Sequence, residues 1–165
     1  ANGNLTISGG LLVVNGPTSN GDGSLDSDGI MTVTGGTIIA VGSTGMVQVP
    51  GTATTQPTMA TSALGSVSAG SIIHIQDASG NDIMTFKSAK TYSSCSLVYS
   101  SSKLTVGQTY SIYKGGSYSG GTETFGYCTG GTYTAGTLVT SVSQSSTVVG
   151  GQGGFGPGPG PGGRI

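Results

Sequence analysis

The chain has 165 residues and a mass of 16.0 kDa, a length that suits one domain or two small β units. It contains 33 glycines, 24 serines and 23 threonines, and good helix formers are scarce, so the composition excludes a helical protein. Only 7% of the residues are charged and the formal net charge is -1, which argues against nucleic acid as a partner. No apolar run approaches the roughly 18 to 20 residues that span a bilayer, so we expect no membrane span.

The first predicted element is an internal repeat. Residues 3–16 (GNLTISGGLLVVNG) align with residues 29–42 (GIMTVTGGTIIAVG) at an offset of 26 residues. Each copy reads as a strand, a Gly-Gly corner and a second strand, and a period in the twenties with glycine at the bends is typical of a parallel β-helix. A hairpin sandwich would also show alternation, but it would not explain two near-copies of one corner.

Strand alternation assigns the side chains of this repeat to two faces. Leu5 and Ile7 would point inward, and Met31 and Val33 would stack on them one coil later. Two coils bury too little to be stable alone, because about three repeats are normally needed. The first coil would therefore present unpaired strand edges and apolar side chains to another chain. The expected assembly-edge residues are Leu5, Ile7, Leu12 and Val14.

The pattern changes in the second half of the chain. The repeat is lost from residue 43, and Pro50 and Pro57 follow, which favours a crossing segment with room for one irregular strand. Alternating runs over residues 71–76 and 82–87 then flank DASGND, a hairpin signal, and further short runs predict a meander or small sandwich. The expected organisation is parallel β-helix coils over 1–49, a crossing segment over 50–70, an antiparallel β unit over 71–149 and a Gly/Pro-rich tail or linker over 150–165.

An acidic loop, NGDGSLDSDG, lies between the two repeat copies. It holds Asp22, Asp26 and Asp28, three of only six acidic residues, and the repeat offset places Asn2 over Asp28. Hard cations such as Ca²⁺ need several oxygens on a flexible turn, although the spacing is not that of an EF-hand. The alternative is an Asp/Gly turn whose carboxylates bond to backbone amides. We predict a calcium site with Asp22, Asp26, Asp28 and Asn2 as ligands, because three clustered carboxylates otherwise repel one another.

The two cysteines of the chain, Cys95 and Cys128, both fall in the expected antiparallel unit. Outside the cell a bridge between them would contribute on the order of 3 to 4 kcal/mol. The alternative is two unpaired thiols on separate strands. We predict the disulfide.

Candidate catalytic residues are few. His74, the only histidine, is flanked by Ile73 and Ile75 and accompanies no nucleophile motif, so it reads as a surface or satisfied strand histidine. Glu123 has no second glutamate to pair with, and the coils contain no Lys or Arg. We therefore predict no catalytic residues and no enzyme activity.

Several segments resemble the carbohydrate-binding domain family of Gram-positive bacterial surface proteins. They are LTISGGLLVVNGPTSNGDGSLDSDG, MTVTGGTIIAVGSTGM and SIIHIQDASGNDIMTFKSAKTY, and the likeness covers roughly residues 1–150. The resemblance implies the last coils of a right-handed parallel β-helix, calcium between coils, binding of acidic plant polysaccharide and a small β unit after the last coil. The family loop Gly-Asp-Gly-x-x-Asp-x-x-Gly maps onto Gly21, Asp22, Gly23, Asp26 and Gly29. Asp28 stands where the family often has Asn, and the cysteine pair and Gly-Pro tail differ from the common pattern.

Two functions follow as expectations. The first is a non-catalytic secreted or cell-surface protein that binds acidic, pectin-like polysaccharide with calcium. The second is a structural subunit that self-assembles head-to-tail into an extracellular β-solenoid filament through the open end of its coils. A chain that starts at Ala1 without Met is expected of a processed secreted protein or of a piece cut from a longer β-helix, and we expect secretion or a cell-surface location for both functions.

Overall fold

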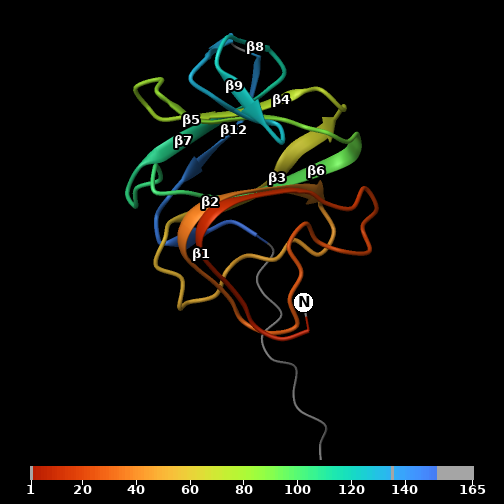
Figure 1. Ribbon diagram of the computed structural model, residues 1–165, viewed down its shortest axis with the longest axis vertical. Coiled ribbons are helices and arrows are strands. Elements are labelled where there is room, and N and C mark those ends of the chain that lie inside the picture. Colours follow the sequence, from red (N-terminus) through yellow and green to blue (C-terminus); the bar gives the residue numbers. More distant parts are fainter. Residues whose placement is uncertain (1, 135, 152–165) are drawn as a thin grey trace, which may run out of the picture.

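The computed structural model describes residues 2–134 and 136–151, which form three β-sheets without any helix (Figure 1). No sheet in this part of the chain closes into a barrel. The all-β class predicted from composition is therefore confirmed, whereas a parallel β-helix is not.

The larger two sheets face each other as a sandwich. Sheet A has the strand order β1 (Leu5–Asn15), β2 (Met31–Ser43), β6 (Tyr92–Ser100), β3 (Thr58–Val67) and β13 (Val148–Val149). Sheet B has the order β12 (Thr137–Ser143), β7 (Thr109–Lys114), β4 (Ile72–Gln76), β5 (Asp82–Lys87), β10 (Tyr127–Thr129) and β9 (Thr122–Thr124). The small sheet C pairs β11 (Thr132–Thr134) with β8 (Ser117–Ser119). Sheet C lies over sheet B on the side away from sheet A (Figure 1).

The sequence repeat forms the parallel pair β1–β2. Leu5 lies opposite Met31 and Ile7 opposite Val33, the stacking that the 26-residue offset predicts. The register shifts between Ile7 and Leu11, where each strand bends at its Gly-Gly corner. The bend needs glycine, because Gly10 and its counterpart in β2 have φ angles of 80° and 91°.

An antiparallel strand ends this parallel stack. β6 lies between β2 and β3 and runs antiparallel to both. The position of a third coil is thus taken by residues 92–100, which belong to the expected antiparallel unit. Sheet A consequently joins residues of the expected coils and of the later unit in one hydrogen-bonded layer.

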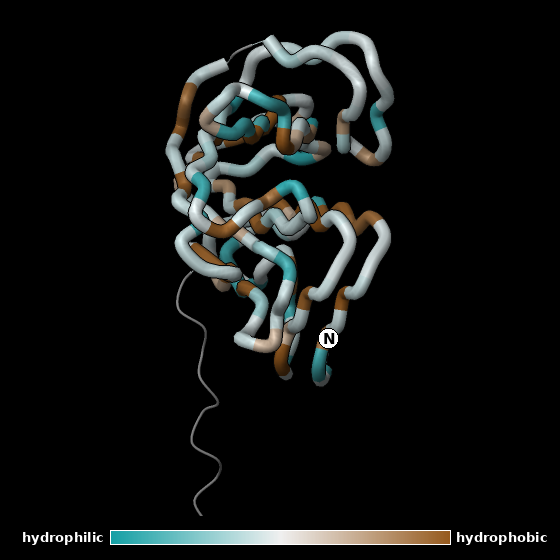
Figure 2. Tube along the Cα trace, turned by 90° about the vertical axis from the view of Figure 1, so that its left-hand side faces the viewer, coloured by the Kyte–Doolittle hydropathy of each residue, from teal (hydrophilic) through white to brown (hydrophobic). Residues whose placement is uncertain are grey.

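Two apolar clusters cover the two faces of sheet A. The larger cluster fills the sandwich between sheets A and B and contains Ile39, Tyr99, Ile73 and Phe86. The smaller cluster lies on the opposite face, where loops 16–30 and 44–57 supply side chains such as those of Leu25 and Val47. Hydrophobic segments accordingly alternate with polar ones along the strands (Figure 2). The described residues contain no helix with the length and apolarity needed to cross a membrane.

Candidate functional site

The open edge of sheet A is the main candidate site. β1 is an end strand of eleven residues, and no described strand pairs with its outer edge. The four predicted assembly-edge residues, Leu5, Ile7, Leu12 and Val14, are only partly buried, and all pack against the smaller apolar cluster. β1 also lacks the charged residues and prolines that usually protect an edge strand. The structure therefore brings the predicted edge residues together on one face of an unprotected edge.

The opposite edge of sheet A is protected. β13 pairs with Thr58 and Met59 of β3. Further along β3, the ammonium group of Lys114 donates hydrogen bonds to the carbonyl oxygens of Leu64 and Ser66, at 2.8 and 2.7 Å. Lys114 lies on β7 of sheet B, and its charged group occupies two carbonyl oxygens of β3 that an added strand would have to use. The two edges thus differ, and β1 is the accessible one.

The C-terminal end of β1 is tied to the loop before β6. The backbone N–H of Ala89 donates to the side-chain oxygen of Asn15 at 3.0 Å, and the Lys90 ammonium donates to the Gly16 carbonyl at 3.0 Å. The buried hydroxyl of Tyr92 donates to the same carbonyl at 3.3 Å. Burial raises the pKa of Tyr92 to about 12, so its hydroxyl stays protonated as a donor at neutral pH. These contacts hold β1 in place although only one of its edges is paired.

The predicted calcium ligands do not form a metal-binding group. Asp22, Asp26 and Asp28 are all exposed, as is Asn2, and Asp26 accepts a hydrogen bond from the Gln48 amide at 3.3 Å. Nowhere within 2–134 and 136–151 do three His, Cys, Asp or Glu side chains gather as they would around a metal ion. Calcium binding therefore stays a prediction.

Hydroxyl and amide groups order the acidic loop instead. The Ser27 hydroxyl donates to the Gly3 carbonyl at 2.6 Å, and the N–H of Gly29 donates to the same carbonyl at 3.0 Å. The Asn4 side-chain oxygen accepts the N–H of Ile30 at 2.9 Å. The segment at Asn2 therefore lies beside the second repeat copy as predicted, and hydrogen bonds of Ser27, Asn4 and the backbone maintain this contact.

The structure corrects the predicted Cys95–Cys128 disulfide, because both cysteines are free, buried thiols. Cys95 belongs to the cluster inside the sandwich. Tyr127 packs against that same cluster from β10, so its neighbour Cys128 points to the other face of sheet B. The two thiols thus lie on opposite sides of sheet B.

A polar row crosses the outer face of sheet B. Cross-strand pairing places Tyr113, His74, Thr85, Cys128 and Glu123 side by side on five neighbouring strands. Sequence reasoning missed this row, because local alternation gives each residue's face but not which strands are neighbours.

His74 in this row is buried, with 3% of its surface exposed. Its Nδ1 lies 2.8 Å from the Thr85 hydroxyl, which donates to Asp82 at 2.9 Å. The ring of Tyr133, from sheet C, stacks on the imidazole at 3.9 Å between centroids. Burial lowers the pKa of His74, and the charge of Asp82 opposes this effect. The histidine is therefore neutral, paired and covered at neutral pH.

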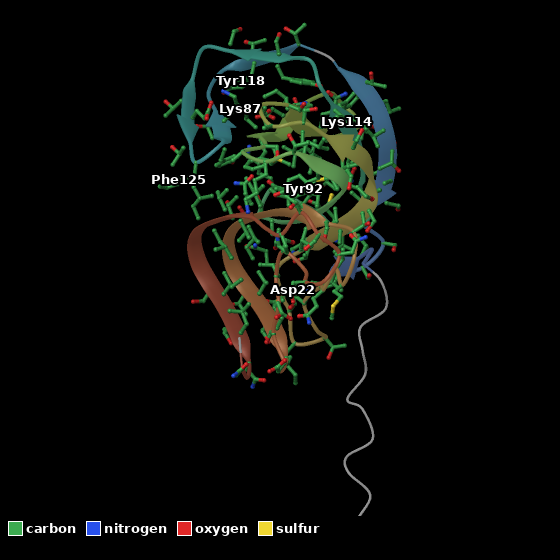
Figure 3. The ribbon with its side chains drawn as sticks, turned by 90° about the vertical axis from the view of Figure 1, so that its right-hand side faces the viewer. Asp22, Lys87, Tyr92, Lys114, Tyr118 and Phe125 are labelled. Carbon is green, nitrogen blue, oxygen red and sulfur yellow. The ribbon has the colours of Figure 1, made fainter. Side chains whose placement is uncertain are left out.

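A groove of about 490 Å³ lies at the edge of the sandwich. It runs from Asn15 at the end of β1 to the turn between β9 and β10, which carries Phe125. Phe125 is 82% exposed and has a φ of 53°, a conformation that favours Gly or Asn over an aromatic residue. The Lys87 ammonium lies 3.4 Å from the Glu123 carboxylate in the same groove. Figure 3 shows Phe125 projecting on the side of the molecule where β1 lies. Sequence reasoning missed this groove, because its lining residues come from segments that lie far apart in the chain.

Comparisons with known proteins identify no relative of this chain. No family model matches the sequence, and no curated protein or solved structure matches the chain. The resemblance to a carbohydrate-binding family therefore stays a prediction.

Proposed function

We propose that the chain is a non-catalytic structural subunit that associates with another β chain by strand addition to β1, in an assembly outside the cell. The observation that carries this proposal is the contrast between the two edges of sheet A. β1 has no strand, charge or proline on its outer edge in the described structure, whereas Lys114 and β13 protect β3.

The chemistry of β1 supports this role. An added strand would satisfy the outward backbone N–H and C=O groups and cover the remaining exposed part of the four apolar side chains. Complete burial of such a side chain contributes roughly 1.5 to 3 kcal/mol, so completing four that are already about two-thirds buried or more would contribute at most roughly 2 to 4 kcal/mol. That gain adds to the backbone hydrogen bonds that an incoming strand would form, and the ordering cost on this side is small because β1 is already ordered.

The state of the reactive side chains also supports a non-catalytic role. Burial raises the pKa of the Cys95 thiol to about 11 and that of the Cys128 thiol as well, so both thiols are protonated at neutral pH. His74 contacts Thr85 through Nδ1, and the ring of Tyr133 covers one of its faces. These groups contribute to packing in the described structure.

Sedimentation of the purified chain over a range of concentrations tests the proposal. We expect the unmodified chain to self-associate and Ile7→Lys to remain monomeric, because a charge on the apolar face of the edge would be buried by an added strand. Thr122→Lys, on β9 at the edge of sheet B, is the matched control and should associate like the unmodified chain. A monodisperse monomer at every concentration of the unmodified chain would overturn the proposal.

Acidic polysaccharide binding is a second candidate, favoured by the groove beside Phe125. Exposed aromatic rings stack on sugar rings, and a sugar carboxylate would replace Glu123 as the partner of the Lys87 ammonium. The family resemblance stated above points to the same ligand class. Retention on polygalacturonate should fall in Phe125→Ala and in Lys87→Gln, whereas retention unchanged in both variants would contradict this candidate.

Calcium is the cofactor that the resemblance implies, and its binding can be tested independently of polysaccharide binding. The acidic loop predicts a higher melting temperature in calcium than in EDTA, and loss of that difference when Asp22 and Asp26 are changed to Asn. Identical melting of the unmodified chain in calcium and EDTA would contradict the calcium prediction.

A further inference from the structure

We propose that the strand added to β1 is β1 of a second copy of this chain, paired antiparallel about a twofold axis between Gly9 and Gly10. This inference rests on the proposed function and names its partner. It predicts a closed dimer in which the two A sheets form one continuous sheet.

The placement of apolar residues along β1 is symmetric about that point. Leu5 and Ile7 precede the Gly-Gly corner, Leu12 and Val14 follow it, and all four pack against the same apolar cluster. In a regular strand, odd and even positions would lie on opposite faces. The register shifts between Ile7 and Leu11 change this alternation and bring the four side chains to one face.

This symmetry allows an antiparallel pair in which Gly9 lies opposite Gly10 of the second copy and apolar residues face apolar residues. Ile7 then lies opposite Leu12 of the second copy, and Leu5 opposite Val14. Both contacts occur twice, once on each side of the axis, as a twofold interface requires. Each apolar side chain of the edge thus meets an apolar side chain rather than water or a polar group.

The opposite face of the strand fits the same register. Thr6 would lie opposite Val13 of the second copy, and Ser8 opposite Leu11, whose side chain is 43% exposed in the single chain. β1 contains no charged residue, so pairing it with itself brings no like charges together. The edge is therefore compatible with its own copy on both faces.

A head-to-tail arrangement suits the structure less well. In such an arrangement β1 would pair with the far edge of sheet A in the next copy, where β13 covers the start of β3. Further along β3, Lys114 already donates to the carbonyls of Leu64 and Ser66, and an incoming strand would have to displace it. Antiparallel pairs are also slightly more stable per residue than the parallel pairs that this arrangement would require.

Mixed cross-linking of the full chain tests the register. Thr6→Cys and Val13→Cys are made as separate variants and then mixed under mild oxidation. Directly opposite strand residues have Cβ atoms close enough for a disulfide, so the mixture should give a covalent heterodimer. Neither variant alone should give a covalent dimer, because Thr6 faces Val13 and not a second Thr6. The native thiols are buried in the folded chain and serve as an internal control.

A second pair of cysteine variants keeps the test valid if Val13→Cys fails to fold. Ser8→Cys and Leu11→Cys are both at exposed positions and should cross-link in the same way. Cross-linking of Thr6→Cys with Ser62→Cys in β3 would instead show head-to-tail pairing and overturn the symmetric dimer, while strand addition at β1 would stand. Open filaments in electron micrographs would overturn it in the same way. A monomer in sedimentation would overturn both proposals.

Discussion

Alanine substitutions in the two Gly-Gly corners should show how much the conformation and packing of these corners contribute to the free energy of unfolding. Gly36 has a φ of 91°, and a Cβ on it would lie 2.8 Å from the Gly10 carbonyl oxygen and from the Gly9 carbonyl carbon. Gly10 has a φ of 80°, but a Cβ there meets nothing within 4 Å. Gly9 has neither constraint, since a Cβ on it would also meet no atom within 4 Å and its φ is not in the left-handed region.

The three substitutions therefore separate backbone strain from crowding. Gly9→Ala should leave the free energy of unfolding unchanged or raise it by about 0.4 to 1 kcal/mol, because alanine restricts the unfolded chain. Gly10→Ala should lower it by about 1 to 2 kcal/mol through the left-handed backbone alone. Gly36→Ala should lower it by roughly 2 to 5 kcal/mol, because about 1 to 3 kcal/mol of overpacking against β1 adds to the same strain.

Urea unfolding of dilute protein, followed by circular dichroism, measures these differences. The order of stability should be Gly9→Ala, then Gly10→Ala, then Gly36→Ala. Equal stability of Gly9→Ala and Gly36→Ala would refute the close packing of the two corners, and with it the parallel β1–β2 pair.

Two further predictions concern the buried groups of the sandwich. Burial lowers the pKa of His74 in the folded state below its ordinary value of 6.5, so the unfolded state binds more protons as the pH falls below 6.5. Stability should therefore decline with falling pH in that range, and the decline should be absent in His74→Gln; an equal decline in both chains would contradict this assignment. For the cysteines, alkylation without reductant should add two labels after unfolding and few before it, because Cys95 and Cys128 are free and buried. No label after unfolding would show that the disulfide exists.

The parallel register of β1 on β2 could be predicted from the sequence because it is encoded locally. The two Gly-Gly corners recur at one offset, and stacking them also aligns the apolar residues on either side. The insertion of β6 could not be predicted in this way. A short apolar run indicates a strand near residues 96–99, but both faces of β6 are buried and its pairing with both β2 and β3 depends on long-range competition between strands.

The candidate sites also divide into features that the local sequence predicts and features that depend on the order of the strands. The partly buried edge residues such as Ile7 follow from alternation and from the position of β1 at the end of its sheet. The Cys95–Cys128 disulfide was an inference from pairing and compartment, neither of which says on which side of a sheet a thiol points. The polar row around His74 joins residues from five strands and became visible only once their order was known.

Hydrogen exchange of the unmodified chain at increasing protein concentration tests strand addition at β1 most directly. In the single chain the outward N–H groups of β1 have no partner strand, so they should exchange quickly at low concentration. We predict that protection of residues 5–15 rises with concentration, while β9, the edge strand of sheet B, keeps its exchange rate. Exchange at residues 5–15 that does not change over the whole concentration range would contradict the account.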